Sequence, residues 1–327
     1  MKANLLLLLT LIVVSGCKTS YMMVAEGESF DALTKITDDK KVCMLPSGGD
    51  NGQNLVFCGI EDDGSSNIYM KDNVLTNAII QKTSGQGFNV FPSYCAANDK
   101  IVFQYLNGTN FDIYYINARS GKAISQVTST DENEYNPSWS SDGKMIVFEK
   151  GATPKSYLIY KSNRKNDKYV EGIKVTQNQI WIKNLETGEL KMIGQGSFPK
   201  FSPTNKEISY VKYDLNKSKT AETGTIWIMS VDGENQKQIT GVDLGYASCP
   251  SWSPDGKNIA FQLTKKGKQD SDIYTISSDG ENLKQHTTNK SQDFSPYWTS
   301  DDYLFFTSDR SNKAGKYLIW RFKLSVK

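Results

Sequence analysis

The chain alternates short apolar runs with polar turn residues. The clearest example is Pro250-Ser-Trp-Ser-Pro-Asp-Gly-Lys-Asn-Ile-Ala-Phe261, whose pattern predicts a strand, a tight turn at Asp-Gly and a second strand. The same pattern returns along the chain, with marker prolines at Pro46, Pro92, Pro137, Pro199, Pro250 and Pro296. Successive markers are 46, 45, 62, 51 and 46 residues apart, so the chain is built from repeats.

Each repeat carries further strand signals. An aromatic run occurs at residues 67–70, 112–115, 179–182, 225–228, 272–275 and 318–321. A run ending in threonine occurs at residues 125–128, 237–240 and 284–287. Four strands at a period of about 45 residues are typical of a propeller blade, and this period is too long and too regular for a solenoid or a sandwich. The sequence therefore predicts an all-β fold, a six-bladed β-propeller of four-stranded blades.

The two ends of the chain predict how this ring closes. The last repeat stops at Lys327 without a fourth strand, whereas residues 33–37 have a fourth-strand pattern with no blade before them. We expect this N-terminal strand to complete the sixth blade, because closure removes the exposed edges of a linear array. The 62-residue gap exceeds its neighbours by about one hairpin, which argues against a seventh blade.

The N-terminus has the features of an export signal. Lys2 precedes an apolar run at residues 5–14, which is too short to span a membrane stably, and Val14-Ser-Gly-Cys17 follows. A cysteine at this place resembles the lipobox of bacterial lipoproteins, which implies cleavage before Cys17 and lipid attachment to it; an ordinary cleaved signal is the alternative. We expect a signal peptide at residues 1–16, a lipidated tether at 17–29 and the propeller at 30–327. Lys18 stands where an aspartate commonly retains lipoproteins in the inner membrane, which favours the periplasmic face of the outer membrane.

Net charge and cysteine positions indicate which partners and which disulfide bonds to expect. Loss of the leader removes Lys2 and leaves 37 basic against 36 acidic side chains, so no nucleic-acid partner is expected. Cys95 and Cys249 fall in opposite blades, too far apart for a disulfide. Whether Cys43 and Cys58, which flank one hairpin, form a pair stays open.

The Pro-Ser-Trp-Ser-Pro-Asp-Gly-Lys motif and its Ile-Ala-Phe strand resemble the blade motif of TolB-type propellers, which also occurs in relatives of prolyl oligopeptidase. The resemblance covers nearly all of residues 30–327. It implies a propeller of the periplasm or envelope that binds other proteins. TolB itself carries an α/β domain before the propeller, where we expect only a short tether, so the resemblance implies the fold and an envelope role but no particular partner.

The motifs that suggest chemistry have structural explanations. Asp142-Gly143 and Asp255-Gly256 fit tight turns, because glycine accepts positive φ, and they lack the spacing of sialidase Asp boxes. His286 is the only histidine and takes the place of Ile239 in the repeat, which puts it on an outer strand. The sequence has no Gly-x-Ser-x-Gly motif of a hydrolase. We therefore predict no catalytic residue, no metal site and no cofactor.

Repeated aromatic residues follow the marker prolines: Tyr94, Trp139, Phe201, Trp252 and Trp298. Their identical place in each repeat favours packing between blades, with a sugar-stacking ring as the alternative. Strand alternation then turns the preceding residues toward the central channel, which gives a candidate lining of Ser93, Ser138, Lys200, Ser251 and Tyr297. A channel of this kind suits a peptide or a small polar ligand.

The long gap predicts an inserted hairpin between Glu149 and Asn178, on the face that also carries irregular connections at residues 211–224 and 263–271. It holds seven basic and three acidic residues. Tyrosines interleaved with basic residues suit an interface, and loops often carry binding residues. The candidate partner-binding residues are Tyr157, Tyr160, Lys161, Arg164, Lys165, Lys168 and Tyr169. A solvated insertion without a role is the alternative.

The sequence thus predicts a lipid-anchored binding module of the cell envelope. Its expected partner is another envelope protein or a peptide, and it contacts the membrane through its lipid. A glycan-binding or glycan-active propeller, of the lyase or hydrolase type, is the alternative. Converging carboxylates or a metal at the channel mouth would distinguish that alternative.

Overall fold

The computed structural model describes residues 33–38, 40–48, 52–85, 87–108, 110–121, 124–151, 173–174, 178–215, 220–310 and 316–324. Within them the regular elements are β-strands, as predicted, and no helix could cross a membrane. The predicted leader and tether, with Cys17, lie outside the described residues. So do the candidate partner-binding residues of the insertion, Tyr157, Tyr160, Lys161, Arg164, Lys165, Lys168 and Tyr169.

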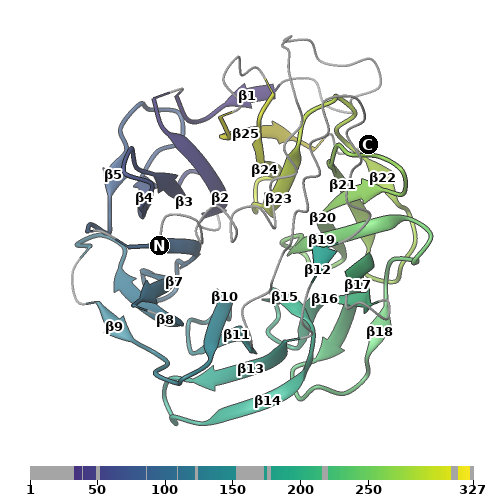
Figure 1. Ribbon diagram of the computed structural model, residues 1–327, viewed down its shortest axis with the longest axis horizontal. Coiled ribbons are helices and arrows are strands. Elements are labelled where there is room, and N and C mark those ends of the chain that lie inside the picture. The colour runs from purple at the N-terminus through teal and green to yellow at the C-terminus, as the bar shows by residue number, and fades with distance from the viewer. Residues whose placement is uncertain are drawn as a thin grey trace, which may run out of the picture.

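The strands form antiparallel meanders that follow one another around a common centre (Figure 1). The first three meanders are β2 (Val42–Gly48), β3 (Leu55–Ile60), β4 (Ser66–Lys71) and β5 (Ile80–Gln81); β6 (Asn89–Cys95), β7 (Lys100–Asn107), β8 (Asn110–Asn117) and β9 (Ser125–Gln126); and β10 (Asn133–Trp139), β11 (Met145–Gly151), β13 (Gln179–Asn184) and β14 (Leu190–Gln195). The next two are β15 (Ser197–Phe201), β16 (Glu207–Leu215), β17 (Thr220–Ser230) and β18 (Lys237–Gln238); and β19 (Gly245–Trp252), β20 (Asn258–Lys265), β21 (Asp272–Ser277) and β22 (Lys284–Gln285). The last meander is β23 (Asp293–Trp298), β24 (Tyr303–Ser308) and β25 (Leu318–Lys323), with β1 (Leu33–Lys35) beside β25.

Two of these meanders are joined, which differs from the predicted four-stranded blades. β17 pairs with β19 at Gly224 and Tyr246, and the short β12 (Ile173–Lys174) also pairs with β17, so nine strands share one sheet. A Cβ on Gly224 would lie 2.6 Å from the Ala247 carbonyl oxygen, so this close approach requires glycine. The prediction of an irregular connection at residues 211–224 was wrong there, because the β16–β17 ladder continues to the pair Leu215 and Ala221.

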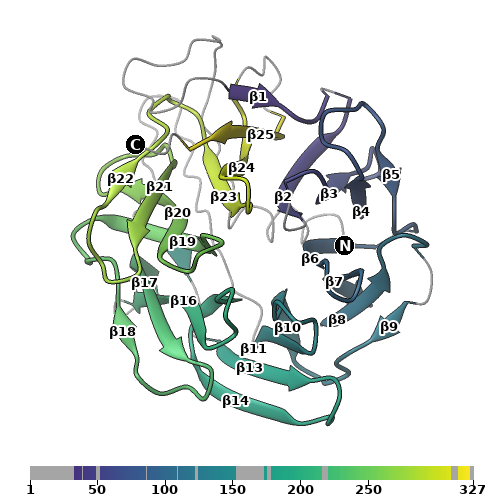
Figure 2. The same cartoon turned by 180° about the vertical axis from the view of Figure 1, so that it is seen from behind.

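A repeated hydrogen bond fixes the third strand of most meanders. The backbone N–H of an isoleucine in that strand donates to a threonine hydroxyl just after the outer strand. The distances are 2.9 Å for Ile68 and Thr83, 2.8 Å for Ile113 and Thr128, 2.8 Å for Ile226 and Thr240, and 2.9 Å for Ile273 and Thr287. The last meander makes the same contact with the other end of the chain. The Ile319 N–H donates to Thr37 Oγ1 at 3.0 Å, and β1 lies antiparallel to β25 (Figure 2).

Apolar side chains fill the wedges between neighbouring meanders. One cluster packs Val102 and Ile113 against Trp139 and Phe148, and another packs residues of the first meander against Phe305 and Ile319 of the last. The repeated aromatic residues take part in these clusters: Trp139, Phe201 and Trp252 are buried, and Tyr94 and Trp298 pack at the edges. Among the described residues no disulfide forms, and Cys43, Cys58, Cys95 and Cys249 are buried thiols.

The contact between the chain ends gives a stability prediction. Thr37→Val keeps the size of the side chain but removes the acceptor of the buried Ile319 N–H, so the free energy of unfolding should fall by about 1–3 kcal/mol. Thr34→Val is the matched control, because Thr34 is exposed and pairs with Arg321 in the same β1–β25 ladder. Urea unfolding of both variants measures the difference. Equal stability of the two variants would contradict the prediction.

Candidate binding pocket

Each inner strand interrupts its ladder at the marker proline. In β10, for example, the pairing with β11 shifts between Tyr135 and Ser138, and the other inner strands β2, β6, β15, β19 and β23 shift at the same place. Proline has no N–H to give to a ladder, so it fits a bulge. The residue before each proline has φ between 49° and 60°, in the left-handed region: Leu45, Phe91, Asn136, Phe198, Cys249 and Ser295.

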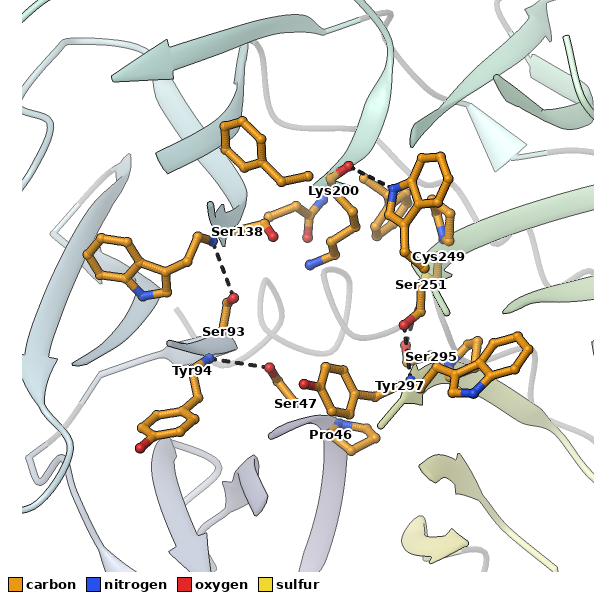
Figure 3. Close-up of a pocket in the computed structure, with 18 of the residues that line it drawn as sticks. Pro46, Ser47, Ser93, Tyr94, Ser138, Lys200, Cys249, Ser251, Ser295 and Tyr297 are labelled. Atoms are coloured by element: carbon orange, nitrogen blue, oxygen red, sulfur yellow. Dashed lines mark hydrogen bonds between the residues drawn. The ribbon is translucent and has the colours of Figure 1, made fainter. Parts of the chain in front are cut away.

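The bulges bring residues from both sides of the proline to the centre of the molecule. There they line a pocket of about 460 Å³ (Figure 3). The lining includes the residues predicted for it, Ser93, Ser138, Lys200, Ser251 and Tyr297, and also Ser47. It further includes every residue before a proline, which sequence reasoning missed because it assumed unbroken alternation. The signal was present, since a proline inside a strand marks a bulge or an edge.

Side chains of the neighbouring meander cap the bulges. The backbone N–H of the residue before the proline donates to a side chain from the second strand of the preceding meander. The donor and acceptor pairs are Leu45 and Thr307 at 3.0 Å, Asn136 and Gln104 at 2.8 Å, Phe198 and Glu149 at 2.5 Å, and Ser295 and Gln262 at 3.1 Å. Each cap both satisfies a buried N–H and ties two meanders together.

The serines of the pocket form a second set of links. Ser47, Ser93 and Ser251 accept, through Oγ, the backbone N–H of the aromatic residue in the next meander, at 3.3, 3.4 and 3.1 Å. Where Lys200 replaces serine, Trp252 Nε1 instead donates to the Lys200 carbonyl at 3.2 Å. Tyr297 Oη donates to the Gly48 carbonyl at 2.5 Å, across the junction of the last and first meanders. The hydroxyl oxygens are therefore partly engaged within the protein.

One end of the pocket is formed by the residues before the prolines, of which Leu45, Phe91, Phe198 and Cys249 are apolar and Asn136 and Ser295 are polar. Phe91 and Phe198 come from inner strands on either side of β10, and their ring centroids are 6.2 Å apart. At the other end the lining consists of turn residues that follow the inner strands, such as Ser141, Pro203 and Ser300. The pocket thus has a largely apolar floor below a polar ring.

Two charged groups break the repeat on one side of this pocket. Glu149 stands where Gln104 and Gln262 stand in other meanders, and its carboxylate also accepts from Asn136 Nδ2 at 2.6 Å and Asn178 Nδ2 at 3.0 Å. Burial raises the pKa of Glu149, against the effect of these hydrogen bonds. Burial lowers the pKa of Lys200 to about 8, so its side chain is still mainly a cation at pH 7.

His286, the only histidine of the sequence, is not among the residues that line the pocket. Gly151, the last described residue before the insertion, pairs with Asn133 at the start of β10. His286 follows β22, stacks on Phe322 and shares a 2.8 Å hydrogen bond with Thr275 Oγ1. Burial lowers the pKa of His286 to about 4, so this side chain is neutral at pH 7. In the described part of the chain, no group of three or more potential metal ligands comes together.

The arrangement of meanders around a central pocket defines a β-propeller. Comparisons with known proteins show which propellers it resembles. The family described as TolB beta propeller domain matches residues 197–325. The chain is 26% identical over 253 residues to the Tol-Pal system protein TolB of Francisella tularensis subsp. holarctica, covering 73% of this chain and 53% of the relative. The chain thus spans about half the length of that relative. The propeller is TolB-like, as the sequence motif implied.

Solved structures show the same fold. TolB from Acinetobacter baumannii superposes with a TM-score of 0.62 at 16% identity, over 81% of this chain and 59% of that one. An oligogalacturonate lyase from Vibrio parahaemolyticus superposes with a TM-score of 0.57 at 16% identity, over 90% and 93% of the two chains. At these identities the similarity concerns the fold alone.

The serine links predict a difference between two residues of the same ring. Ser251→Ala removes the acceptor of the Trp298 N–H and should lower the free energy of unfolding by about 1 kcal/mol. Ser138→Ala is the control, because no hydrogen bond of Ser138 Oγ occurs within the described residues, and its stability should stay within about 0.5 kcal/mol of the wild type. Thermal and urea unfolding check both values. An equal loss in the two variants would show that the link does not stabilise the junction.

Proposed function

We propose that this chain is a lipid-anchored protein of the cell envelope that binds a segment of another envelope protein in its central pocket, without catalysis. The observation that carries the proposal is the pocket, in which residues from every inner strand surround one volume of about 460 Å³. A volume of this order holds a few side chains of a peptide or a small ligand. The rigid sheets around it position the lining before the ligand arrives, which lowers the entropy cost of binding.

The proposal includes a ring of six four-stranded blades closed by the N-terminal strand. The pairing of β1 with β25 and the hydrogen bond from Ile319 to Thr37 support it. Two further bonds link the last meander to the first: Leu45 N–H to Thr307, and Tyr297 Oη to the Gly48 carbonyl. A ring without open edges protects strands that would otherwise pair with other chains.

The envelope location rests on two arguments. The relative is named as a Tol-Pal system protein, which supports an envelope role for the similar propeller here. The sequence Val14-Ser-Gly-Cys17 supports a lipid on Cys17, with the domain held at the periplasmic face of the outer membrane. The insertion with its tyrosines and basic residues is a second candidate surface for the same partner.

A glycan-active propeller is the second candidate, because the oligogalacturonate lyase is an enzyme with this fold. The titratable side chains in the described pocket lining are Tyr94, Lys200, Cys249 and Tyr297. These supply hydrogen-bond donors rather than the carboxylate pair of a glycosidase or the ligand set of a metal lyase. The lining therefore supports binding more than catalysis.

Lipidation predicts the behaviour of one substitution. Cys17→Ser removes the thiol that would carry the lipid, so the variant should take up no palmitate analogue and should leave the outer-membrane fraction. Metabolic labelling followed by membrane fractionation measures both effects. Cys43→Ser is the control, because Cys43 is a buried thiol of the fold and should not affect labelling. Equal label on Cys17→Ser and wild type would exclude the anchor.

Filling the pocket should abolish capture of the partner. Ser138→Phe projects a ring into the lining and should reduce capture from detergent extracts about tenfold or more, whereas Ser84→Phe, on an exposed loop, should not. The readout is quantitative mass spectrometry of proteins bound to the solubilised full-length chain, with melting curves to verify folding. Replacing residues 162–168 by an Asn-Gly turn tests the insertion in the same assay. Unchanged capture by Ser138→Phe would reject the pocket as the binding site.

A further inference from the structure

Lys200 interrupts an otherwise uncharged ring. The residue after the marker proline is serine in four inner strands, Ser47, Ser93, Ser138 and Ser251, and tyrosine in β23. In β15 it is Lys200, whose side chain points to the middle of the ring (Figure 3). No carboxylate occurs in the described lining, so the pocket carries a positive charge at its centre.

This ammonium group has no ion-pair or hydrogen-bond partner among the described residues. The carboxyl group of Glu149 acts on it only through space, and burial keeps the nearby Cys249 thiol neutral at pH 7 by raising its pKa to about 11. Glu149 is committed elsewhere, because its oxygens accept from Asn136, Asn178 and the Phe198 N–H. A partly buried cation without a partner costs free energy. Lys200 therefore destabilises the fold at a position where four other inner strands carry serine. A destabilising residue of this kind is expected where the side chain serves binding.

The surrounding hydroxyls can add donors to the cation. A serine hydroxyl has one hydrogen and two lone pairs. In Ser47, Ser93 and Ser251 the oxygen already accepts a backbone N–H from the next meander. The hydrogens of these hydroxyls have no acceptor within the described residues and can turn toward a ligand. A cation ringed by O–H donors matches an anion with several acceptor lone pairs, such as a carboxylate.

We propose that Lys200 binds a carboxylate of the ligand, and that this ligand is a peptide with an apolar side chain next to the carboxylate. The peptide assignment rests on the proposed function. It is favoured by the floor of the pocket, where Phe91 and Phe198 offer apolar surface to a side chain and few partners to a polyhydroxylated sugar. The carboxylate is either a chain terminus or an acidic side chain.

Small probes test the site directly on the solubilised full-length protein. N-acetyl-leucine presents a terminal carboxylate beside an apolar side chain, and N-acetyl-aspartate amide presents a side-chain carboxylate. N-acetyl-leucinamide lacks the charge, and galacturonate is an acidic sugar. Calorimetric titration should show saturable binding of one or both peptide carboxylates and at least tenfold weaker binding of the amide. Which of the two binds identifies the source of the carboxylate.

Variants separate a binding role from a structural one. Lys200→Ser, which restores the residue of the other strands, should abolish carboxylate binding and at the same time raise Tm, because it removes the unpartnered cation. Lys200→Arg should keep measurable binding. Undiminished binding by Lys200→Ser, or the absence of binding to the wild type by every carboxylate probe, would overturn the proposal. Binding of galacturonate alone would overturn the peptide assignment.

The outcomes distinguish this inference from the proposed function. If Ser138→Phe loses the envelope partner while Lys200→Ser retains it, the pocket binds a protein but Lys200 is not its anchor. If neither variant changes capture, the proposed function fails, and the probe titrations still decide whether Lys200 binds a carboxylate.

Discussion

Four of the six junctions between meanders depend on one backbone N–H of the inner strand, which the bulge removes from its own ladder. At Leu45, Asn136, Phe198 and Ser295 this N–H donates to a side chain of the preceding meander. A buried N–H without an acceptor costs free energy, so the acceptor cannot be lost cheaply. The left-handed residue, the proline and the cap therefore form one unit, and its repetition sets how the inner strands face the centre.

The same unit explains why one side of the pocket is charged and the other sides are neutral. A neutral cap such as Gln104 or Gln262 satisfies the N–H and nothing more. Glu149 places a buried carboxylate in that position, and two residues beyond the N–H that it caps, Lys200 places a cation in the pocket. The bulge at this junction has the same backbone geometry as the others. The charge of the side chains therefore differs from junction to junction, while the backbone arrangement stays the same. A propeller can therefore acquire a new ligand by changing one or two side chains of a ring.

The sequence predicted most of the scaffold and, of the pocket, the residues that follow the marker prolines. The marker prolines and the aromatic strands indicated the order of the meanders, because both local patterns recur in each repeat. Alternation placed Ser93, Ser138 and Ser251 correctly, since they lie beyond the bulge in an intact stretch of ladder.

The rest depended on contacts that local patterns do not encode. Phe91 and Phe198 approach each other because the bulges of β6 and β15, on either side of β10, bring both residues into the pocket. The β17–β19 contact depends on the long reach of β17 and on the missing side chain of Gly224. The carboxylate of Glu149 likewise accepts a hydrogen bond from Asn178, a residue that is distant in sequence. Periodicity predicts which face a residue takes, but not which distant partner it meets there.

The pairing of β1 with β25 has a consequence for the timing of folding. The hydrogen bond from Ile319 to Thr37 joins residues 282 positions apart. Contacts between such distant segments form slowly, and during synthesis the partner strand does not yet exist. β1 therefore has no partner until β25 has been synthesised. A truncated or stalled chain that lacks β25 leaves β1 open to pairing with other molecules, so the protection of this strand depends on a segment made almost three hundred residues later.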